Sequence, residues 1–388
     1  RTNPQGGLSC RYPMTRWLRA TASIVRTFLD FARRNNPSIK TKTKGDKNIM
    51  FSLKKTLAGL TAVALMGAAP AAVVAQDMPG EGVTVNMAQA TWDTGWFHAE
   101  IYRQLISELG YDVPQITTLD NPPFYQTVAQ GDMDLWVNGW FPLHNTYEDT
   151  FSNGAELVGA VAEGGALEGY LVNASAVEEF GITSLEDFKR DEVKEAFDRN
   201  GDGMADMVAC PPGWGCEINI EHHMDAYDLR DHINPIKAGY AASMADAVAA
   251  YDSGENILFY TWTPNWTVNE LVPGEDVMWI EVPEVDLPDM SMADAATMDG
   301  VEGCVNDPCT LGFPANDIVP VANSAFLEEN PAVRALLESA SIPLADIFAQ
   351  NAAMNEGDDD IEAQAAQWIE DNRDMVDGWL ETARGAAS

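Results

Sequence analysis

Residues 83–137 read VTVNMAQATWDTGWFHAEIYRQLISELGYDVPQITTLDNPPFYQTVAQGDMDLWV, and short β-branched runs alternate in them with runs that are apolar at helical spacing. The first kind of run is typical of strands and the second of helices. Strands that alternate with helices form βαβ units, so this stretch predicts an α/β fold with a mainly parallel sheet. The strands are expected at Val83–Ala88, Ile116–Leu119 and Met133–Val137, and the helices at Phe97–Leu109 and Pro123–Gln130.

A second set of the same kind follows without a low-complexity linker. Two α/β sets in a chain of 388 residues indicate two lobes, with a ligand site where strand ends from both lobes face a crevice. We expect lobe 1 at residues 82–167 plus 312–388 and lobe 2 at 168–311, with a loop or edge segment at 284–311. The remaining expected strands are Gly169–Val172, Met207–Ala209 and Ile257–Thr261, and the helices are Leu185–Phe197, Glu217–Asp231, Ser243–Ser253, Ser324–Glu329, Ala332–Ser339, Pro343–Glu356 and Ile361–Ala383.

The segment MFSLKKTLAGLTAVALMGAAPAAVVAQ (50–76) has the pattern of a secretory signal peptide. Two lysines precede an apolar run, and Val73-Val74-Ala75 form a small-residue cleavage site. The apolar run is too short for a membrane span, and no cysteine lies at the cleavage site to carry a lipid. We therefore expect residues 50–75 to direct export to the periplasm without a membrane anchor. Residues 1–49 are expected to be a non-native upstream extension.

The chain is strongly acidic, with a net charge of −37. Residues 1–75 carry 13 basic and two acidic residues, whereas residues 76–388 carry 10 basic and 58 acidic ones. A surface with so much negative charge repels nucleic acid and anionic lipid, which excludes both as partners. The charge also suits a cationic ligand, although acidic surfaces commonly serve solubility in salty media, where screening acts over roughly 8–10 Å.

Four cysteines lie in the part expected to be exported, as two close pairs. In an oxidising compartment the expected pairing is local, Cys210 with Cys216 and Cys304 with Cys309. Metal ligation is the alternative, but neither pair has the spacing of a zinc ribbon, and no histidine lies within a few residues of either pair.

Three of the ten tryptophans after residue 75 occupy unusual places. Trp140 and Trp262 follow predicted strands, and Trp214 lies within CPPGWGC, between the first pair of cysteines. A rigid indole at the mouth of a cleft offers its π-face to a cation, and such a contact is worth roughly 0.5–2 kcal/mol. We assign Trp136, Trp279, Trp368 and Trp379 to packing, and leave Trp92, Trp96 and Trp266 unassigned.

Four segments resemble the periplasmic glycine betaine/proline betaine-binding proteins of ABC uptake systems. They are NGWFPLH (138–144), FDRNGDGMADMVACPPGWGCEINIEHHMDAY (197–227), YTWTPNWTVNEL (260–271) and LPDM (287–290). The resemblance runs across nearly all of residues 82–384. It implies a two-lobed periplasmic binding protein of type II-like fold, with its ligand in the interlobe cleft, that acts as a monomer with an ABC permease and is not an enzyme.

The resemblance also implies roles for individual residues. Three tryptophans of the family box a quaternary ammonium, and Trp140, Trp214 and Trp262 match them. The ligand carboxylate is held in the family by a histidine and by two backbone N–H groups, matched here by His144 and by Gly215 and Cys216. A histidine donates to a carboxylate, with charge assistance if it is protonated, and successive N–H groups form an anion nest. The predicted cage contains no carboxylate, so we expect a zwitterion rather than a bare cation.

The segment from Asp198 to Asp206 carries oxygen side chains at the spacing of the front of an EF-hand calcium loop. The potential ligands are Asp198, Asn200, Asp202 and Asp206, but Ala209 replaces the glutamate expected at the last position. The segment is therefore either a structural calcium site or an Asx-rich turn without metal. No other cofactor is expected.

No catalytic residue is predicted, because no motif joins a nucleophile to its base and the pair His222-His223 lacks the HExxH pattern. Two alternatives stay open. The ligand can be choline, carnitine or a sulfonium analogue, or the protein can be a calcium-dependent secreted hydrolase with a tryptophan-lined cleft, which needs two carboxyl groups facing that cleft.

Overall fold

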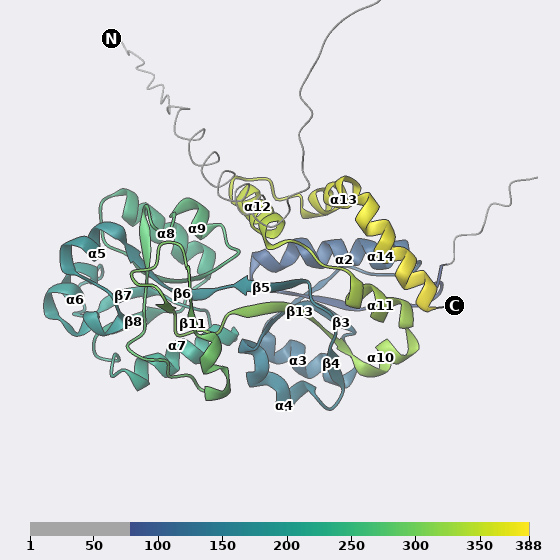
Figure 1. Ribbon diagram of the computed structural model, residues 1–388, viewed down its shortest axis with the longest axis horizontal. Coiled ribbons are helices and arrows are strands. Elements are labelled where there is room, and N and C mark those ends of the chain that lie inside the picture. The colour runs from purple at the N-terminus through teal and green to yellow at the C-terminus, as the bar shows by residue number, and fades with distance from the viewer. Residues whose placement is uncertain (1–77, 388) are drawn as a thin grey trace, which may run out of the picture. The chain divides into compact units, whose positions relative to one another are not determined.

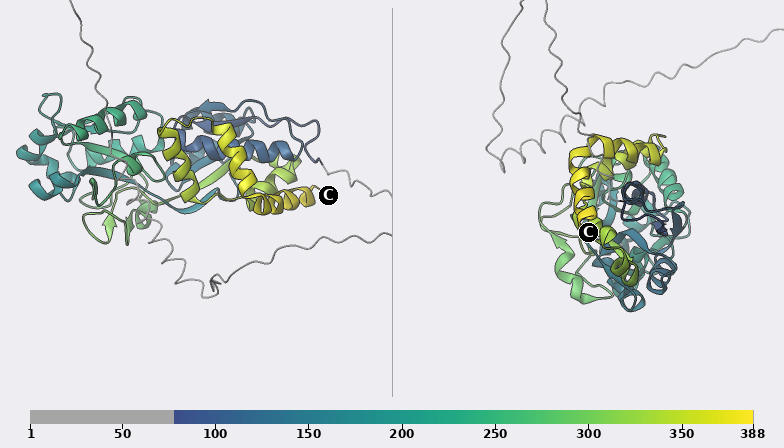
Figure 2. Two further views of the ribbon diagram at one scale, coloured as in Figure 1. Left: turned by 90° about the horizontal axis from the view of Figure 1, so that it is seen from above. Right: turned by 90° about the vertical axis from the view of Figure 1, so that its right-hand side faces the viewer.

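The computed structural model describes residues 78–387, and Figure 1 shows its helices and strands. The predicted signal peptide at 50–75 and the predicted extension at 1–49 lie outside these residues. The described chain forms two main sheets, each with its own helices, and the view from above in Figure 2 shows the same two groups of elements. None of the helices in residues 78–387 has the length and the hydropathy needed to cross a bilayer.

The first sheet is built from both ends of the described chain. Its strand order is β2-β1-β3-β13-β4, and β5 also pairs with β13. β1 runs parallel to β2 and β3, whereas β13 is antiparallel to β3, β4 and β5. The strands are β1 (Met87–Ala90), β2 (Thr117–Leu119), β3 (Leu135–Phe141), β4 (Ala155–Leu157), β5 (Ala162–Ala166) and β13 (Asn316–Asn323).

The second sheet contains only strands from the middle of the chain, in the order β10-β6-β9-β7-β8. β7 is parallel to β8 and β9, and β6 is antiparallel to β9 and β10. Its strands are β6 (Glu168–Asn173), β7 (Ala205–Val208), β8 (Ile233–Ile236), β9 (Leu258–Trp262) and β10 (Val277–Ile280). A two-stranded sheet of β11 (Thr297–Met298) and β12 (Cys309–Thr310) accompanies it, with η4 (Met290–Ala295) just before.

The expectation of mainly parallel sheets is wrong, because both main sheets are mixed. The chain passes from β5 to β6 through Leu167 alone, without a crossover helix, and β6 then pairs antiparallel to both of its neighbours. The return strand β13 was not predicted. Its sequence NDIVPVAN carries Pro320, which argues against an inner strand. A register shift between Val319 and Val321 accommodates the proline, since the backbone is irregular there.

Most helices that cover the two sheets lie where the sequence predicts them. Two of the predicted helices are each divided into two shorter ones. The segment Leu185–Phe197 divides at Arg190, whose ψ of 129° is extended, and Ile361–Ala383 divides at Asn372. The longer helices are α2 (Trp96–Glu108), α3 (Asn121–Gln130), α7 (Gly215–Ala226), α8 (Tyr240–Asp252), α11 (Pro331–Ser339), α12 (Leu344–Asn355), α13 (Ile361–Asp371) and α14 (Arg373–Ala386). The shorter ones are η1 (Asp93–Gly95), η2 (Leu143–Tyr147), α4 (Glu148–Phe151), α5 (Ala174–Phe180), η3 (Leu185–Lys189), α6 (Asp191–Phe197), α9 (Thr267–Glu270) and α10 (Ser324–Glu329).

An aromatic core supports the end of β3. Trp136 is 1% exposed, and its ring centroid lies 4.2 Å from that of Phe124 and 5.7 Å from that of Trp92. Prolines at the start of α3 fix the backbone there, because proline fits the first helical turn without losing a hydrogen bond. Trp279 is also buried, as predicted, and Trp368 stacks with Trp379 at a centroid distance of 6.3 Å.

Removing the Phe124 side chain tests this support. Phe124 is fully buried, so Phe124→Ala leaves a cavity against Trp136 and is expected to lower the free energy of unfolding by about 3–5 kcal/mol. Gln126→Ala on the exposed side of the same helix is the control and should change it by less than about 0.5 kcal/mol. Equilibrium unfolding in guanidinium chloride measures both. Equal effects of the two substitutions would contradict a packed core at this point.

Candidate functional site

One pocket with an empty volume of about 280 Å³ collects all six residues predicted to bind a ligand. Elements of both main sheets contribute to the pocket. Its lining consists of the predicted Trp140, His144, Trp214, Gly215, Cys216 and Trp262, together with Trp92, Leu143, Glu168 and Tyr260.

The indole rings meet at steep angles. Trp214 and Trp262 lie 5.5 Å apart between ring centroids, with an interplanar angle of 78°. Trp92 and Trp214 lie 5.2 Å apart at 67°. Rings at such angles form adjacent walls, so that several π-faces border one small space.

Each predicted cage tryptophan is anchored through its indole N–H. Trp140 donates to Asn138 Oδ1 at 2.9 Å, two residues earlier on β3. Trp214 donates to Thr91 Oγ1 at 2.8 Å, and Trp262 donates to Thr94 Oγ1 at 3.2 Å. These two threonines follow β1 of the first sheet, whereas Trp262 lies on β9 of the second sheet and Trp214 directly precedes α7. The hydrogen bonds therefore hold both rings against the residues that follow β1.

The loop before α7 places Trp214 at the start of that helix. Cys210 and Cys216 form a disulfide across the loop, and Cys304 and Cys309 form the second one. Gly213 has φ of +94°, a conformation that disfavours side chains. A Cβ added to Gly215 would lie 2.8 Å from Cδ2 of His144, so only glycine fits beside the imidazole.

The first two N–H groups of α7 belong to residues that line this pocket, and they have no acceptor. Neither the Gly215 N–H nor the Cys216 N–H donates to another group within residues 78–387, and Trp214 provides no side-chain cap. The start of a 12-residue helix also carries the positive end of its dipole. This end of the pocket is therefore suited to an anionic group.

His144 is buried in η2 and uncharged. Burial lowers the pKa of His144 to about 3, so a charge-assisted hydrogen bond to a ligand does not form at neutral pH. Its Nδ1 accepts a hydrogen bond from the backbone N–H of Trp140 at 3.1 Å and lies 2.8 Å from the Tyr125 hydroxyl. Because a backbone N–H can only donate, Nδ1 carries no proton, and the proton of the neutral ring is on Nε2.

The side-chain amide of Asn121 completes the surroundings of the imidazole. The amide nitrogen of Asn121 lies 3.0 Å from Nε2 of His144. In this orientation the amide oxygen, Oδ1, has no hydrogen-bond partner. Exchanging the amide oxygen and nitrogen gives Oδ1 the Nε2 proton and removes the clash of two donors. His144 is thus held as a neutral Nε2–H donor beside the start of α7.

Glu168 corrects the expectation that no carboxylate lies in the cage. It is the first residue of β6, is 2% exposed and lines the pocket. The Tyr260 hydroxyl donates to its Oε1, and the side-chain amide of Asn316 donates to Oε2 at 2.9 Å. Burial raises the pKa of Glu168 to about 7, although both hydrogen bonds act in the opposite direction.

Four lining residues were not predicted as site residues. Trp92 was left unassigned. Leu143 stands within the NGWFPLH segment and Tyr260 begins the YTWTPNWTVNEL segment, so the resemblance was the available signal for both. Nothing in the local pattern marks Glu168, which reaches the pocket through the pairing of β6 with β9.

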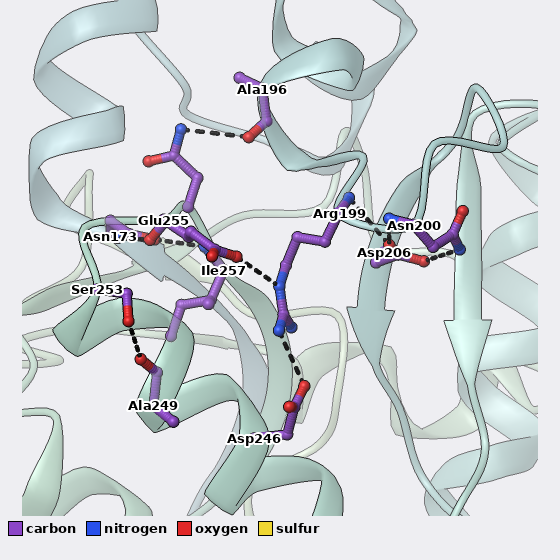
Figure 3. A network of polar contacts seen from close by, with 11 residues as sticks. Asn173, Ala196, Arg199, Asn200, Asp206, Asp246, Ala249, Ser253, Glu255 and Ile257 are labelled. Atoms are coloured by element: carbon purple, nitrogen blue, oxygen red, sulfur yellow. Dashed lines mark hydrogen bonds and ion pairs between the residues drawn. The ribbon is translucent and has the colours of Figure 1, made fainter.

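The predicted calcium ligands form a hydrogen-bonded turn, part of which Figure 3 shows. Asp206 Oδ2 accepts from the N–H groups of Arg199 and Asn200, both at 3.0 Å. Asp198 accepts from the N–H groups of Gly201, Asp202 and Gly203. Within residues 78–387 no group of three or more His, Cys, Asp or Glu side chains is arranged to hold a metal ion. These contacts fit the Asx-rich turn that the sequence left as an alternative.

The substrate-binding domain of ABC-type glycine betaine transport systems is the family whose sequence model matches residues 83–371. The chain belongs to this family. It is 37% identical over 317 residues to a glycine betaine-binding periplasmic protein of Dickeya dadantii, covering 81% of this chain and 93% of that protein. It is also 37% identical over 316 residues to the glycine betaine/proline betaine-binding periplasmic protein of Escherichia coli, covering 80% and 93%.

Solved structures agree on the fold. A lactococcal protein of this kind, in its closed-liganded conformation with glycine betaine, matches with a TM-score of 0.58 and 23% identity, covering 77% of this chain and 99% of that one. The two-lobed binding-protein fold is therefore confirmed. The chain is a substrate-binding component of a transport system rather than an enzyme, and the secreted-hydrolase alternative is set aside.

Buried histidines give the stability of the protein a pH dependence. Burial lowers the pKa values of His98, His144 and His223 to about 3, whereas an unfolded chain protonates histidine near pH 6.5. Unfolding therefore takes up protons between these values, and the stability present above pH 6.5 is lost as the pH falls toward 3. Each histidine contributes about 1.4 kcal/mol per pH unit within this window.

His144→Gln is expected to reduce this slope by the share of one histidine. The measurement is the free energy of unfolding in denaturant at several pH values between 4 and 6, for the variant and the wild type in parallel. An unchanged slope would show that His144 is protonated in the folded protein, contrary to its burial.

Proposed function

We propose that this protein captures glycine betaine or proline betaine in the periplasm and delivers it to the permease of an ABC importer. The supporting observation is the pocket itself, which combines aromatic walls with unpaired N–H groups. A betaine carries a quaternary ammonium and a carboxylate on one small framework. The two chemistries of the pocket match the two ends of such a molecule.

The ammonium end is assigned to Trp140, Trp214 and Trp262. A trimethylammonium group donates no ordinary hydrogen bond, so it is recognised by π-faces that surround it. The indole N–H groups of these residues are already engaged with Asn138, Thr91 and Thr94, which leaves the ring faces for the ligand. Trp92 adds a fourth ring to the wall.

The carboxylate end is assigned to the start of α7. The N–H groups of Gly215 and Cys216 lack acceptors, and the helix dipole favours an anion there. The Nε2–H of His144 lies beside Gly215 and is a third donor. The ligand carboxylate would compete with the Asn121 oxygen for this proton.

We further propose that the cage closes by a hinge between the lobes, with lobe 1 at residues 82–167 plus 312–388 and lobe 2 at 168–311. The assignment is supported by the sheets, because Trp140 lies on β3 whereas Trp214 and Trp262 belong to elements of the second sheet. Separation of the lobes would break the hydrogen bonds to Thr91 and Thr94. The complete cage would then exist only in the closed protein.

Export by the signal peptide at residues 50–75 and action as a monomer belong to the same proposal. The relatives from Dickeya dadantii and Escherichia coli are periplasmic proteins, which supports this location. Choline, carnitine and sulfonium analogues stay the alternative ligands, since each offers a cation to the same aromatic walls.

Substitution of Trp214 tests the proposed cage. Trp214→Ala removes one π-face and is expected to weaken glycine betaine binding by about 2- to 30-fold, the equivalent of 0.5–2 kcal/mol. Isothermal titration calorimetry measures the Kd. Trp368→Phe is the matched control, because Trp368 packs against Trp379 and does not line the pocket. Unchanged affinity in Trp214→Ala would refute the cage, and a wild type that binds no betaine would refute the function.

We propose, finally, that calcium stabilises the loop from Asp198 to Asp206 without being required for folding. The amide nitrogen of Asn200 lies 3.0 Å from Asp202 Oδ2 and 2.7 Å from Asp206 Oδ1, so two carboxylate oxygens converge on one point. Turning this amide would offer its oxygen to the same point, but would break the hydrogen bond that Oδ1 accepts from the Asp202 N–H at 2.8 Å. Two carboxylates and an amide oxygen are ligands that suit calcium, although the bidentate glutamate of an EF-hand is missing.

Calcium at ten times its Kd is then expected to raise the Tm by roughly 3 °C relative to chelator. Asp202→Asn should abolish the rise, whereas Asp299→Asn, which alters an exposed carboxylate elsewhere, should preserve it. A Tm that is the same with calcium and with chelator identifies the loop as an Asx-rich turn.

A further inference from the structure

Glu168 is a buried carboxyl group whose hydrogen bonds within residues 78–387 are both with neutral partners. Its two oxygens accept hydrogen bonds from Tyr260 and Asn316, and it forms no ion pair within residues 78–387. Among the residues that line the pocket with it there is no lysine or arginine. A buried charge is normally paired, because desolvation makes an isolated one unfavourable. The protein itself thus leaves this negative charge without a positive partner.

The position of Glu168 relates it to the aromatic end of the pocket. β6 pairs antiparallel with β9, and in this register Glu168 stands directly opposite Trp262. Side chains directly opposite in an antiparallel pair share one face, with Cβ atoms about 4.5–5.5 Å apart. Tyr260, two residues before Trp262, lies on the same face and holds the carboxyl group in place.

Glu168 also lies where the chain crosses between the two sheets. It begins β6 two residues after β5 ends, and its partner Asn316 begins β13 on the return. The Oδ1 atom of Asn316 accepts from the Leu143 N–H at 2.9 Å, next to His144. Neutral side chains of β9 and of the return strand β13 therefore fix the carboxyl group in the pocket wall.

Resting on the proposed function, we infer that Glu168 is a further specificity-determining residue: its carboxylate is the counter-charge for the quaternary ammonium held against Trp262. This assignment extends the ligand class. A zwitterion gains from Glu168 at its cationic end but is repelled at its carboxylate, whereas a bare organic cation gains without that opposing effect. The pocket is therefore expected to bind carboxylate-free quaternary ammonium ions as well as betaines.

Ionisation of Glu168 supplies a signature that a purely structural role lacks. Burial raises its pKa to about 7, so the group is half protonated at neutral pH. Among the titratable groups near it, burial holds the pKa values of Tyr170 and Tyr260 well above 10, and burial lowers that of His144 to about 3. None of these three changes charge between pH 6 and 8. A bound cation favours the ionised carboxylate, so affinity should rise as the pH rises through 7.

The test uses tetramethylammonium, which has no titrating group, beside glycine betaine. In calorimetric titrations at pH 8, Glu168→Gln is expected to weaken tetramethylammonium binding about tenfold and glycine betaine binding less. Wild-type affinity for tetramethylammonium should increase from pH 6 to pH 8, and the variant should show a flat profile. Glu163→Gln, an exposed position on β5, is the matched control and should behave as the wild type.

Two further measurements separate recognition from structural support. Titrations of the wild type at pH 7 in buffers of different ionisation enthalpy should show release of up to about half a proton on tetramethylammonium binding. Tyr260→Phe removes a donor that stabilises the ionised carboxylate, so the midpoint of its pH profile should move upward.

The outcomes distinguish this inference from the function on which it rests. A wild type that binds neither ligand overturns the proposed function. A wild type that binds glycine betaine but not tetramethylammonium, or that binds both with no pH dependence and no proton release, overturns the role of Glu168 alone. Equal weakening of both ligands by Glu168→Gln with an unchanged pH profile would assign it to structural support and also overturn the inference.

Discussion

The turn between β7 and α7 is the constraint on which the site depends. A disulfide closes it, Gly213 has a positive φ, and Gly215 packs against the His144 imidazole. These features place an indole ring and two unpaired N–H groups next to one another. An aromatic face and hydrogen-bond donors are thereby brought together in one small pocket, which is the combination that the proposed zwitterionic ligand requires. Preorganisation of this kind lowers the entropy that binding must overcome.

The pocket depends equally on contacts that cross between the sheets. Thr91 and Thr94, which follow β1, accept from Trp214, which precedes α7, and from Trp262 on β9 of the second sheet. The side-chain amide of Asn316 donates to Glu168 and accepts from the Leu143 N–H, so it connects two residues that line the pocket. The walls therefore belong to no single lobe. A ligand that contacts them all would stabilise the closed arrangement, which is the condition for coupling capture to delivery.

The electrostatics of the pocket differ from those of the surface. Residues 76–388 carry 58 acidic side chains, yet the pocket is bordered mainly by uncharged aromatic groups, a neutral histidine and one carboxyl group of raised pKa. Surface charge is screened by salt, whereas groups inside a dry pocket are screened much less. A few buried groups therefore contribute more to ligand recognition than the acidic surface does.

The sequence by itself determined the α/β class, the order of most helices, both cysteine pairs and six residues of the pocket. These features are local, since Trp140 with His144, Trp214 with its cysteines and Trp262 each stand in a short motif of restricted backbone. Only the tertiary structure showed that both sheets are mixed. The antiparallel strand β13 could not be predicted, because Pro320 within it argues against an inner strand. The tertiary structure also decided that Trp92, Glu168 and Tyr260 join the pocket and that His144 is neutral. Strand register and burial determine these properties, and both arise from residues far apart along the chain.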